Sequence, residues 1–186
     1  MEHHITLPLT KEKAAGLSCG DTVYLSGELY TGRDAAHKRL CELLEQGKPL
    51  PFPVHDACLY YVGPSPARPG QVIGSAGPTT SYRMDSYAPA LLRLGLRGMI
   101  GKGARSPEVI RAMQEAGAVY LAAIGGAGAL LSSCIKTCTV IAFEDLGAEA
   151  IHHLVVENFP AVVAIDAQGK NLYTEGRQNY LSQTFG

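Results

Sequence analysis

From residue 64 onward, short apolar runs alternate with segments that favour helices. Helix candidates are residues 86–94, a segment that begins at Ser106-Pro107-Glu108, and residues 148–156. The serine, proline and acid of the second candidate are typical of a helix N-terminus. Strand candidates lie between and around these helices, at residues 72–74, 98–100, 119–121, 139–143 and 161–165. Such alternation predicts an α/β domain, in which helices pack on a sheet.

The part of the chain before residue 64 is richer in strand signals. Residues 4–9 and 21–29 favour strands, and residues 33–46 favour a helix that ends at Gly47. A proline-rich connector over residues 49–53 leads into an apolar run at residues 57–62. This connector is too short to divide the chain, so we expect one domain over residues 1–186. Near the other end, residues 166–170 predict a tight turn that joins two terminal strands.

Composition excludes several classes of protein. A hydrophobic fraction of 46% and a charged fraction of 18% are those of a soluble globular protein. The formal charge of −1 gives no basic field for nucleic acid or an anionic membrane surface. No apolar run approaches the roughly 20 residues that cross a bilayer. The N-terminus lacks the layout of a signal peptide, and five irregularly spaced cysteines do not resemble a disulfide framework. A cytoplasmic location is therefore expected.

Residues 74–85 form the segment most suggestive of a binding site. Small residues here let the backbone approach a ligand, and Thr79, Thr80 and Ser81 supply neutral hydroxyl groups. Arg83 adds a planar fork suited to a carboxylate. A plain turn that caps the next helix explains the same composition. Spacing alone leaves both interpretations open.

Two other spots carry cationic or titratable side chains. Arg33 and His37 lie one helical turn apart, on the same side of the predicted helix. Lys102 stands between Gly101 and Gly103, just after a predicted strand, where α/β folds usually bind ligands. Each also has a structural explanation, since arginines at helix starts are usually solvated and lone histidines are usually structural.

Two further features do not indicate a site. Residues 125–129 are rich in glycine, but they lack the G-x-G-x-x-G register and a following P-loop lysine, so a tight strand-to-helix turn is the better interpretation. Cys134 and Cys138 have helical spacing and match no zinc or cluster motif, so we interpret them as packed thiols.

The segment Gly77-Pro78-Thr79-Thr80-Ser81-Tyr82-Arg83-Met84-Asp85 resembles the signature of the beta region of class I fumarate hydratases and L-tartrate dehydratases. The family's other landmarks follow in order and cover nearly the whole chain, at residues 31–37, 101–103, 125–127, 144–150 and 159–161. The resemblance implies a swivelling β/β/α layered domain with a mixed sheet.

The resemblance also implies a partner. In the family, a 4Fe–4S cluster with one iron open to substrate is held by three cysteines of an alpha subunit or region that is absent here. None of this chain's cysteines matches those ligands, so no metal-binding residue is assigned. The expected assembly is a homodimer or a heterotetramer that includes the iron–sulfur alpha subunit.

The activity implied by the resemblance is that of a hydro-lyase acting on a small dicarboxylate. The expected reaction is reversible hydration of fumarate to malate. L-tartrate dehydration to oxaloacetate and a non-catalytic anion-binding module are the alternatives. Thr79, His37 and Lys102 are the expected catalytic residues, with His37 either orienting Arg33 or taking part in proton transfer. The expected substrate-binding residues are Arg33, Thr79, Thr80, Ser81, Arg83 and Lys102.

Overall fold

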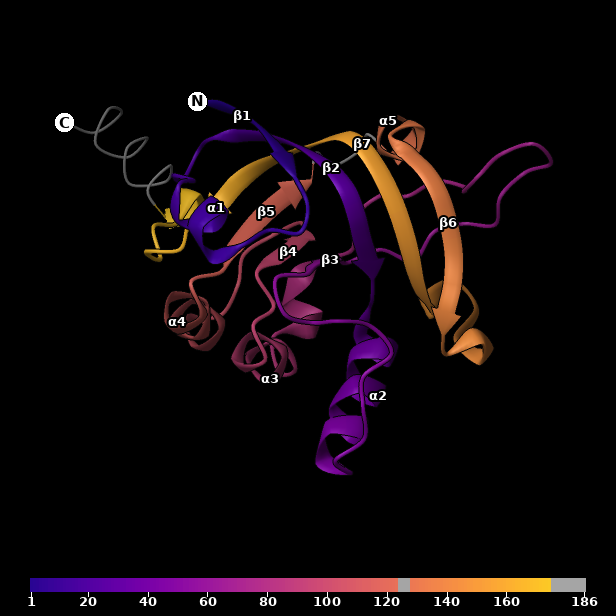
Figure 1. Ribbon diagram of the computed structural model, residues 1–186, viewed down its shortest axis with the longest axis horizontal. Coiled ribbons are helices and arrows are strands. Elements are labelled where there is room, and N and C mark those ends of the chain that lie inside the picture. Colours follow the sequence, from indigo (N-terminus) through magenta and orange to yellow (C-terminus); the bar gives the residue numbers. More distant parts are fainter. Residues whose placement is uncertain (124–127, 175–186) are drawn as a thin grey trace.

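The computed structural model describes residues 1–123 and 128–174, and its described strands form one mixed seven-stranded sheet in the order β1-β2-β3-β4-β5-β7-β6 (Figure 1). Five neighbouring strands run parallel to one another. They are β1 (Glu2–Thr6), β2 (Thr22–Thr31), β3 (Cys58–Tyr60), β4 (Gly98–Gly101) and β5 (Val119–Ala123). The long strand β7 (Ile151–Ile165) and the outer strand β6 (Ile135–Ala142) complete the sheet in antiparallel pairings.

The sheet closes on itself through β7. This strand pairs with β5 near its end and also with β2, where Tyr30 lies opposite His153 and Tyr24 opposite Pro160. The pairings β2-β3-β4-β5-β7-β2 therefore form a ring. Because β2 to β5 are parallel, their carboxyl ends meet at one edge of this ring.

Two hydrophobic cores separate the molecule into layers. Successive side chains along β3, β4 and β5 point to opposite faces of the sheet, as the pleat requires. Tyr60, Ile100 and Leu121 join the first core, together with side chains of β1, β2 and β7. Their neighbours Leu59, Met99 and Tyr120 join the second core, which packs against helices.

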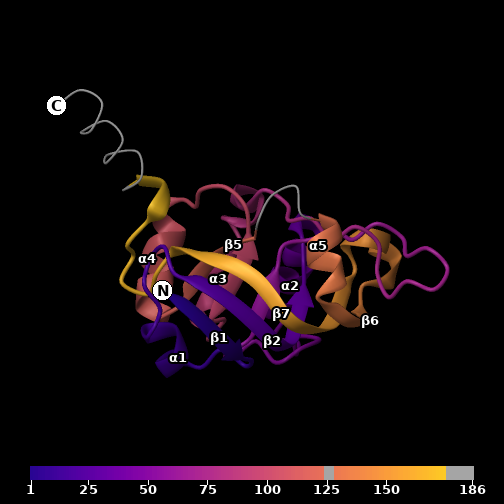
Figure 2. The ribbon, with the colours of Figure 1, turned by 90° about the horizontal axis from the view of Figure 1, so that it is seen from above.

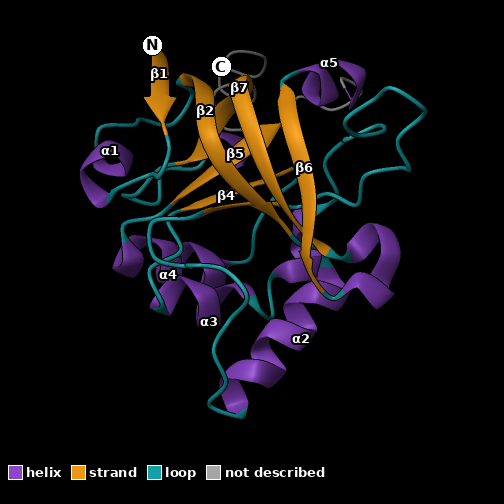
Figure 3. Cartoon of the chain, turned by 45° about the vertical axis from the view of Figure 1, so that its right-hand side comes forward, coloured by secondary structure: helices purple, strands orange, loops and turns teal. Residues whose placement is uncertain are grey.

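Three helices cover the second core. They are α2 (Asp34–Glu45), α3 (Ala88–Arg93) and α4 (Pro107–Ala116), and they lie on the same side of the strands in Figure 3. Seen from above, β7 crosses over α2 and α3, with β1 and β2 beside it (Figure 2). The remaining described helices are short: α1 (Lys11–Ala15), α5 (Gly128–Ser133) and the 3-10 segments η1 (Ser81–Met84) and η2 (Glu144–Glu149).

Local signals predicted most of these elements correctly. The Ser106 hydroxyl accepts a hydrogen bond from the backbone N–H of Val109 at 3.3 Å, and Gly117 ends α4 with a left-handed φ of 66°. The predicted α/β class is confirmed. So are the predicted helices at residues 33–46 and 86–94 and the strands at residues 21–29, 98–100, 119–121, 139–143 and 161–165, with shifted ends. The apolar run at residues 57–62 contains β3. The predicted strand at residues 4–9 begins earlier, as β1, and ends at Thr6.

Two predicted elements are wrong. Residues 148–156 do not form the predicted helix, because η2 ends at Glu149 and β7 begins at Ile151, where it pairs with β6 on one side and β2 on the other. Residues 72–74 do not form a strand. Instead this stretch leads into a loop in which the Ser75 N–H donates to the Ser65 hydroxyl at 2.7 Å, and the Ser65 N–H to the Ser75 carbonyl at 3.0 Å. The first error arises where pairing with a distant segment decides the backbone conformation, and the second where hydrogen bonds within a loop do.

Three smaller predictions have mixed outcomes. Residues 166–170 form the predicted turn, but the described chain after it makes only a single bridge from Asn171 to Ile165 and then turns helical at residues 172–174. Of the glycine-rich segment 125–129, residues 125–127 lie outside the described residues, and Gly128 begins α5. Cys134 and Cys138 pack against the first core as predicted, although Cys138 lies on β6 rather than on a helix. In the described ranges, no helix combines the length and apolar character that a membrane span requires.

Candidate active site

The candidate residues after β3 and β4 meet at the carboxyl-end edge of the ring. The chain runs from β4 into Lys102, while the Thr79–Ser81 stretch crosses the same edge. The Thr79 N–H donates to the Tyr61 carbonyl at 2.7 Å, and the Ser81 N–H donates to the Lys102 carbonyl at 2.9 Å. Thr80 and Lys102 form a parallel bridge. The structure therefore places the predicted hydroxyl cluster beside the predicted lysine.

Both candidate arginines are oriented by carboxylates of the chain. Arg83 Nη2 donates to Asp34 Oδ2 at 2.9 Å, and Arg33 Nε lies 3.5 Å from Glu149 Oε1. Since Asp34 directly follows Arg33, these contacts link the start of α2 with η1 and η2. The Arg83 side chain remains 42% exposed. Each arginine therefore keeps part of its guanidinium for another acceptor.

Gly63 makes room for the Arg33 side chain. A Cβ atom at Gly63 would lie 2.7 Å from Arg33 Nη1 and 2.9 Å from Arg33 Cδ. Any larger residue would therefore displace this guanidinium. Gly101 has a similar role beneath the hydroxyl cluster, since a Cβ there would lie 2.0 Å from the Ser81 hydroxyl oxygen. Both glycines allow a close approach between backbone and site side chains.

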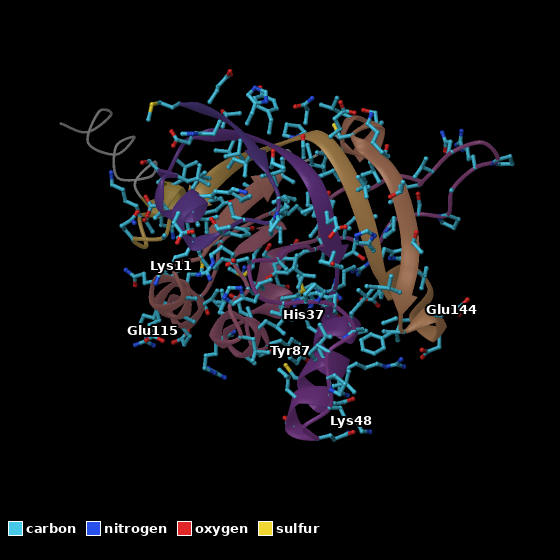
Figure 4. All side chains as sticks on the ribbon, in the orientation of Figure 1. Lys11, His37, Lys48, Tyr87, Glu115 and Glu144 are labelled. Atoms are coloured by element: carbon cyan, nitrogen blue, oxygen red, sulfur yellow. The ribbon has the colours of Figure 1, made fainter. Side chains whose placement is uncertain are left out.

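His37 is fully buried and lies near the start of α2 (Figure 4). Its Nδ1 donates to the Arg33 carbonyl at 2.7 Å, and its ring meets Tyr61 edge-on at 5.3 Å between centroids. Burial lowers the pKa of His37 to about 4, and the nearby charge of Arg105 acts in the same direction. The imidazole is therefore neutral at pH 7, with its proton on Nδ1. Nε2 has no hydrogen-bond partner among the described residues.

The three hydroxyl residues differ in their contacts. Ser81 is buried, and its hydroxyl lies 2.8 Å from that of Tyr120, which in turn donates to the Gly103 carbonyl at 2.9 Å. Thr79 and Thr80 are half-buried. Neither the Thr79 hydroxyl nor the Lys102 ammonium group pairs with another residue in the described part of the chain. Both groups are therefore available to a ligand, and so is the Thr80 hydroxyl, which also has no partner among the described residues.

A buried ion pair beneath the site escaped the sequence reasoning. Arg105 Nε donates to Asp85 Oδ1 at 2.7 Å, and the Arg105 side chain is 0% exposed. Asp85 lies inside the motif that carries the resemblance, so its position was a usable signal. Arg105 gave none, because an arginine before a helix cap is usually solvated. Asp34 and Glu149, the partners of the candidate arginines, also lie in landmark segments, but their pairing with Arg83 and Arg33 joins segments that are distant in sequence.

Metal-binding side chains do not gather in the described ranges, where no three His, Cys, Asp or Glu residues form a candidate metal site. Burial, together with the nearby Asp56 charge, raises the pKa of Cys58 to about 12. This thiol therefore stays protonated, whereas metal ligation requires a thiolate.

Comparison with known proteins places this arrangement in a family. The family model described as "Fumarase C-terminus" matches residues 2–176. A protein of Methanocaldococcus jannaschii provisionally named L(+)-tartrate dehydratase subunit beta is 38% identical over 173 residues, covering 90% of this chain and 89% of that protein. The anaerobic class I fumarate hydratase of Escherichia coli is 41% identical over 153 residues, covering 81% of this chain but 28% of that enzyme. Fumarate hydratase 2 of Leishmania major is 39% identical over 158 residues, with 84% and 28% coverage. This chain thus spans less than a third of these two fumarate hydratases, and it belongs to the fumarase C-terminal family.

Proposed function

We propose that the chain is the beta subunit of an iron–sulfur-dependent hydro-lyase that reversibly hydrates fumarate to malate. The observation that carries this proposal is the gathering of the Arg33, Thr79, Arg83 and Lys102 segments at one edge of the ring, in a chain of this family. The names of the relatives, which are fumarate hydratases and a tartrate dehydratase subunit, support the same class of reaction.

Arg33, Arg83 and Lys102 bind the substrate. Two guanidinium groups and an ammonium group match the two carboxylates of a dianion in charge, and the planar forks add orientation. Asp34 holds Arg83 through Nη2, so the remaining nitrogens of the guanidinium face the substrate. Glu149 restrains Arg33 in the same way. These carboxylates offset part of the positive charge of the site.

Thr79 and Lys102 act at the reacting atoms. Hydration of the alkene moves a proton at a carbon next to a carboxylate, and that carbon is only weakly acidic. Negative charge then develops on the carboxylate in the transition state, where the Lys102 ammonium and the arginines stabilise it. Thr79 relays the proton through its unpaired hydroxyl. A threonine is a poor base alone, so it needs an acidic or basic group from the partner chain.

Thr80, Ser81 and His37 support these groups. Thr80 lies beside the substrate, and Ser81 shapes the site through its backbone and its bond to Tyr120. For His37, the structure favours orienting Arg33 over proton transfer. Its ring is fully buried, it is neutral at pH 7, and its proton is committed to the Arg33 carbonyl.

A partner subunit completes the site. The described thiols of this chain do not fit an iron–sulfur cluster, because they form no ligand group and Cys58 stays protonated. We therefore assign the 4Fe–4S cluster to an alpha subunit. Arg83 and Lys102 lie exposed at the edge of this chain, which is consistent with a site shared between two chains.

Several finer features belong to the same proposal. Residues 1–186 act as one swivelling β/β/α layered domain, which the two cores and the helical layer support. The assembly is a homodimer or a heterotetramer with the alpha subunit, in the cytoplasm. L-tartrate is the alternative substrate, favoured by the name of the Methanocaldococcus jannaschii relative, which matches this chain along most of its length.

Anaerobic co-purification from the native source tests this proposal. The purified complex would be assayed with fumarate and with L-tartrate, and its iron and sulfide measured. We expect a stoichiometric iron–sulfur partner and turnover of one diacid. A chain that purifies alone, without iron and without activity on either acid, would instead support a non-catalytic anion-binding module.

A further inference from the structure

A buried cation lies directly beneath the two segments that carry the candidate residues. The Arg105 guanidinium is 5.3 Å from the centre of the Tyr61 ring and 5.1 Å from that of the Tyr120 ring, so it sits between two aromatic side chains. Asp85 supplies its counter-charge at 2.7 Å. A buried ion pair stabilises a fold weakly or not at all compared with apolar residues of similar size.

Asp85 and Arg105 each belong to one of the two segments that carry candidate residues. Asp85 directly follows η1, which begins at Ser81, and its Oδ2 accepts a hydrogen bond from the Ser106 N–H at 2.8 Å. Arg105 follows Lys102 by three residues. The Arg105–Asp85 pair therefore connects the Thr79–Asp85 segment to the Lys102–Ser106 segment.

The two tyrosines extend the same connection. Tyr120 bonds Gly103 through its hydroxyl and contacts the Ser81 hydroxyl at 2.8 Å. The Tyr61 carbonyl accepts the Thr79 N–H at 2.7 Å, and the Tyr61 ring packs against His37. Arg105 thus packs on two rings. One belongs to Tyr61, which bonds Thr79, and the other to Tyr120, which bonds Gly103 next to Lys102.

We propose that Arg105, together with Asp85, is a positioning residue that holds the Thr79 and Lys102 segments in register for turnover of the dicarboxylate. This inference rests on the proposed function. This positioning role requires a guanidinium, because only a planar cation can stack between two rings while its edge donates to a carboxylate. A lysine keeps the charge but loses this geometry.

A second buried ion pair, Arg97–Asp56, provides a control that distinguishes a positioning role from a contribution to stability alone. Arg97 lies at the other end of β4, and its Nη2 donates to Asp56 Oδ1 at 2.9 Å. The Arg97 side chain is 6% exposed, which is close to the 0% of Arg105. Arg97 also donates to the Ala116 carbonyl, and no candidate site residue is among its contacts in the described part of the chain. Arg97→Lys is therefore the control for Arg105→Lys.

Steady-state kinetics of the assembled enzyme with each variant test the proposal. We expect Arg105→Lys to lower kcat by about 10- to 100-fold, the effect of misplacing reacting groups by a fraction of a bond length. KM should change by less than about threefold, because Arg33, Arg83 and Lys102 are retained. Arg97→Lys should leave kcat within about twofold, since Arg97 pairs with Asp56 and the Ala116 carbonyl and not with a candidate site residue. Equal losses of kcat in both variants would overturn the positioning role.

Two further measurements cover other outcomes. If Arg105→Lys does not assemble, Asp85→Asn removes the counter-charge with little change in shape, and we expect a smaller loss confined to kcat. If the wild-type complex turns over neither diacid, the proposed function fails. The positioning claim is then tested by amide hydrogen exchange at Ser81, whose N–H bonds the Lys102 carbonyl. Exchange at Ser81 should accelerate in Arg105→Lys and not in Arg97→Lys, and equal rates would overturn the claim.

Discussion

Each end of β4 carries a buried arginine–aspartate ion pair, but the surroundings of the two pairs differ. At the amino end, Arg97 pairs with Asp56, and at the carboxyl end Arg105 pairs with Asp85. Both arginines are buried and both bonds are close to 3 Å or shorter. The first pair fastens a turn to the end of α4 through the Ala116 carbonyl. The second connects two segments whose outer side chains include an exposed lysine and an arginine that is 42% exposed.

This comparison shows that a buried ion pair does not by itself mark a functional site. The carboxyl end differs because polar groups near its pair lack hydrogen-bond partners among the described residues. They include the Thr79 hydroxyl and the Lys102 ammonium group. Parallel strands bring their carboxyl ends to one edge, and the connecting segments there are free to carry ligand-binding groups. The amino end has only to join elements, so its polar groups are used within the chain.

The largest effect should appear in stability and should be similar at both ends. Arg97→Met and Arg105→Met each leave a partly buried carboxylate without its partner, and we expect each to lower the free energy of unfolding by about 3–5 kcal/mol. Urea denaturation of the two variants would measure this. A loss at one end only would break the comparison, because it would mean that the two pairs differ in their structural role.

The next effect should be confined to the carboxyl end. Arg83→Ala removes a carboxylate-binding fork while leaving both cores intact, and we expect kcat/KM of the assembled enzyme to fall by about 10²–10³-fold, as for loss of one transition-state donor. Arg93→Ala is the control, because Arg93 is also exposed but lies at the end of α3. Circular dichroism should show both variants folded. Full activity of Arg83→Ala would remove Arg83 from the site.

The third effect is a dependence of stability on pH. The pKa of His37 is about 4 in the folded chain, against an ordinary value of 6.5. As pH falls below 6.5, the unfolded chain therefore takes up a proton at this residue and the folded chain does not. Stability is fully present above pH 6.5 and declines by about 3 kcal/mol as pH falls to about 4.

Variants can assign this decline to His37. His37→Gln should flatten the fall in unfolding free energy between pH 6.5 and 4, leaving a remainder from His152, whose pKa is also lowered by burial. If His37→Gln and the parent chain decline in parallel, the buried neutral state of His37 is incorrect.

The smallest effect concerns one hydroxyl. Ser81→Ala removes the contact with the Tyr120 hydroxyl, which keeps its bond to Gly103, so we expect a loss of about 1 kcal/mol in stability. Thermal unfolding would detect it. Ser18→Ala, which changes an exposed serine before the amino end of β2, should have no measurable effect. Equal melting temperatures for Ser81→Ala and the parent would show that the Ser81 hydroxyl has no role in holding the segment.

Sequence reasoning succeeded where local chemistry decides the outcome. The Ser106 cap and the apolar runs of β4 and β5 are local signals, and they predicted their elements. It failed at residues 148–156, where small and acidic residues favour a helix locally. There β7 pairs with β6 and with β2, and β2 is more than a hundred residues away in sequence. These pairings impose a strand.

The candidate site was predictable to a similar extent. Arg33, Thr79, Arg83 and Lys102 stood in recognisable motifs, but spacing could not show that Asp34 would hold Arg83 or that Ser81 would bond Lys102. Arg105 could not be found from the sequence, because charged side chains are rarely buried and it is covered by side chains of the second core, Tyr61, Met99 and Tyr120, that come from three different strand segments. Contacts between segments far apart in the sequence are therefore what the structure adds.

The most direct test of this account is hydrogen exchange of the assembled enzyme with and without its diacid. We predict that bound fumarate or L-tartrate slows exchange at Thr79–Arg83 and at Lys102–Gly103, and leaves Leu94–Arg97 at the amino end unchanged. Slowed exchange at the amino end, with none at Thr79–Arg83, would contradict the placement of the site.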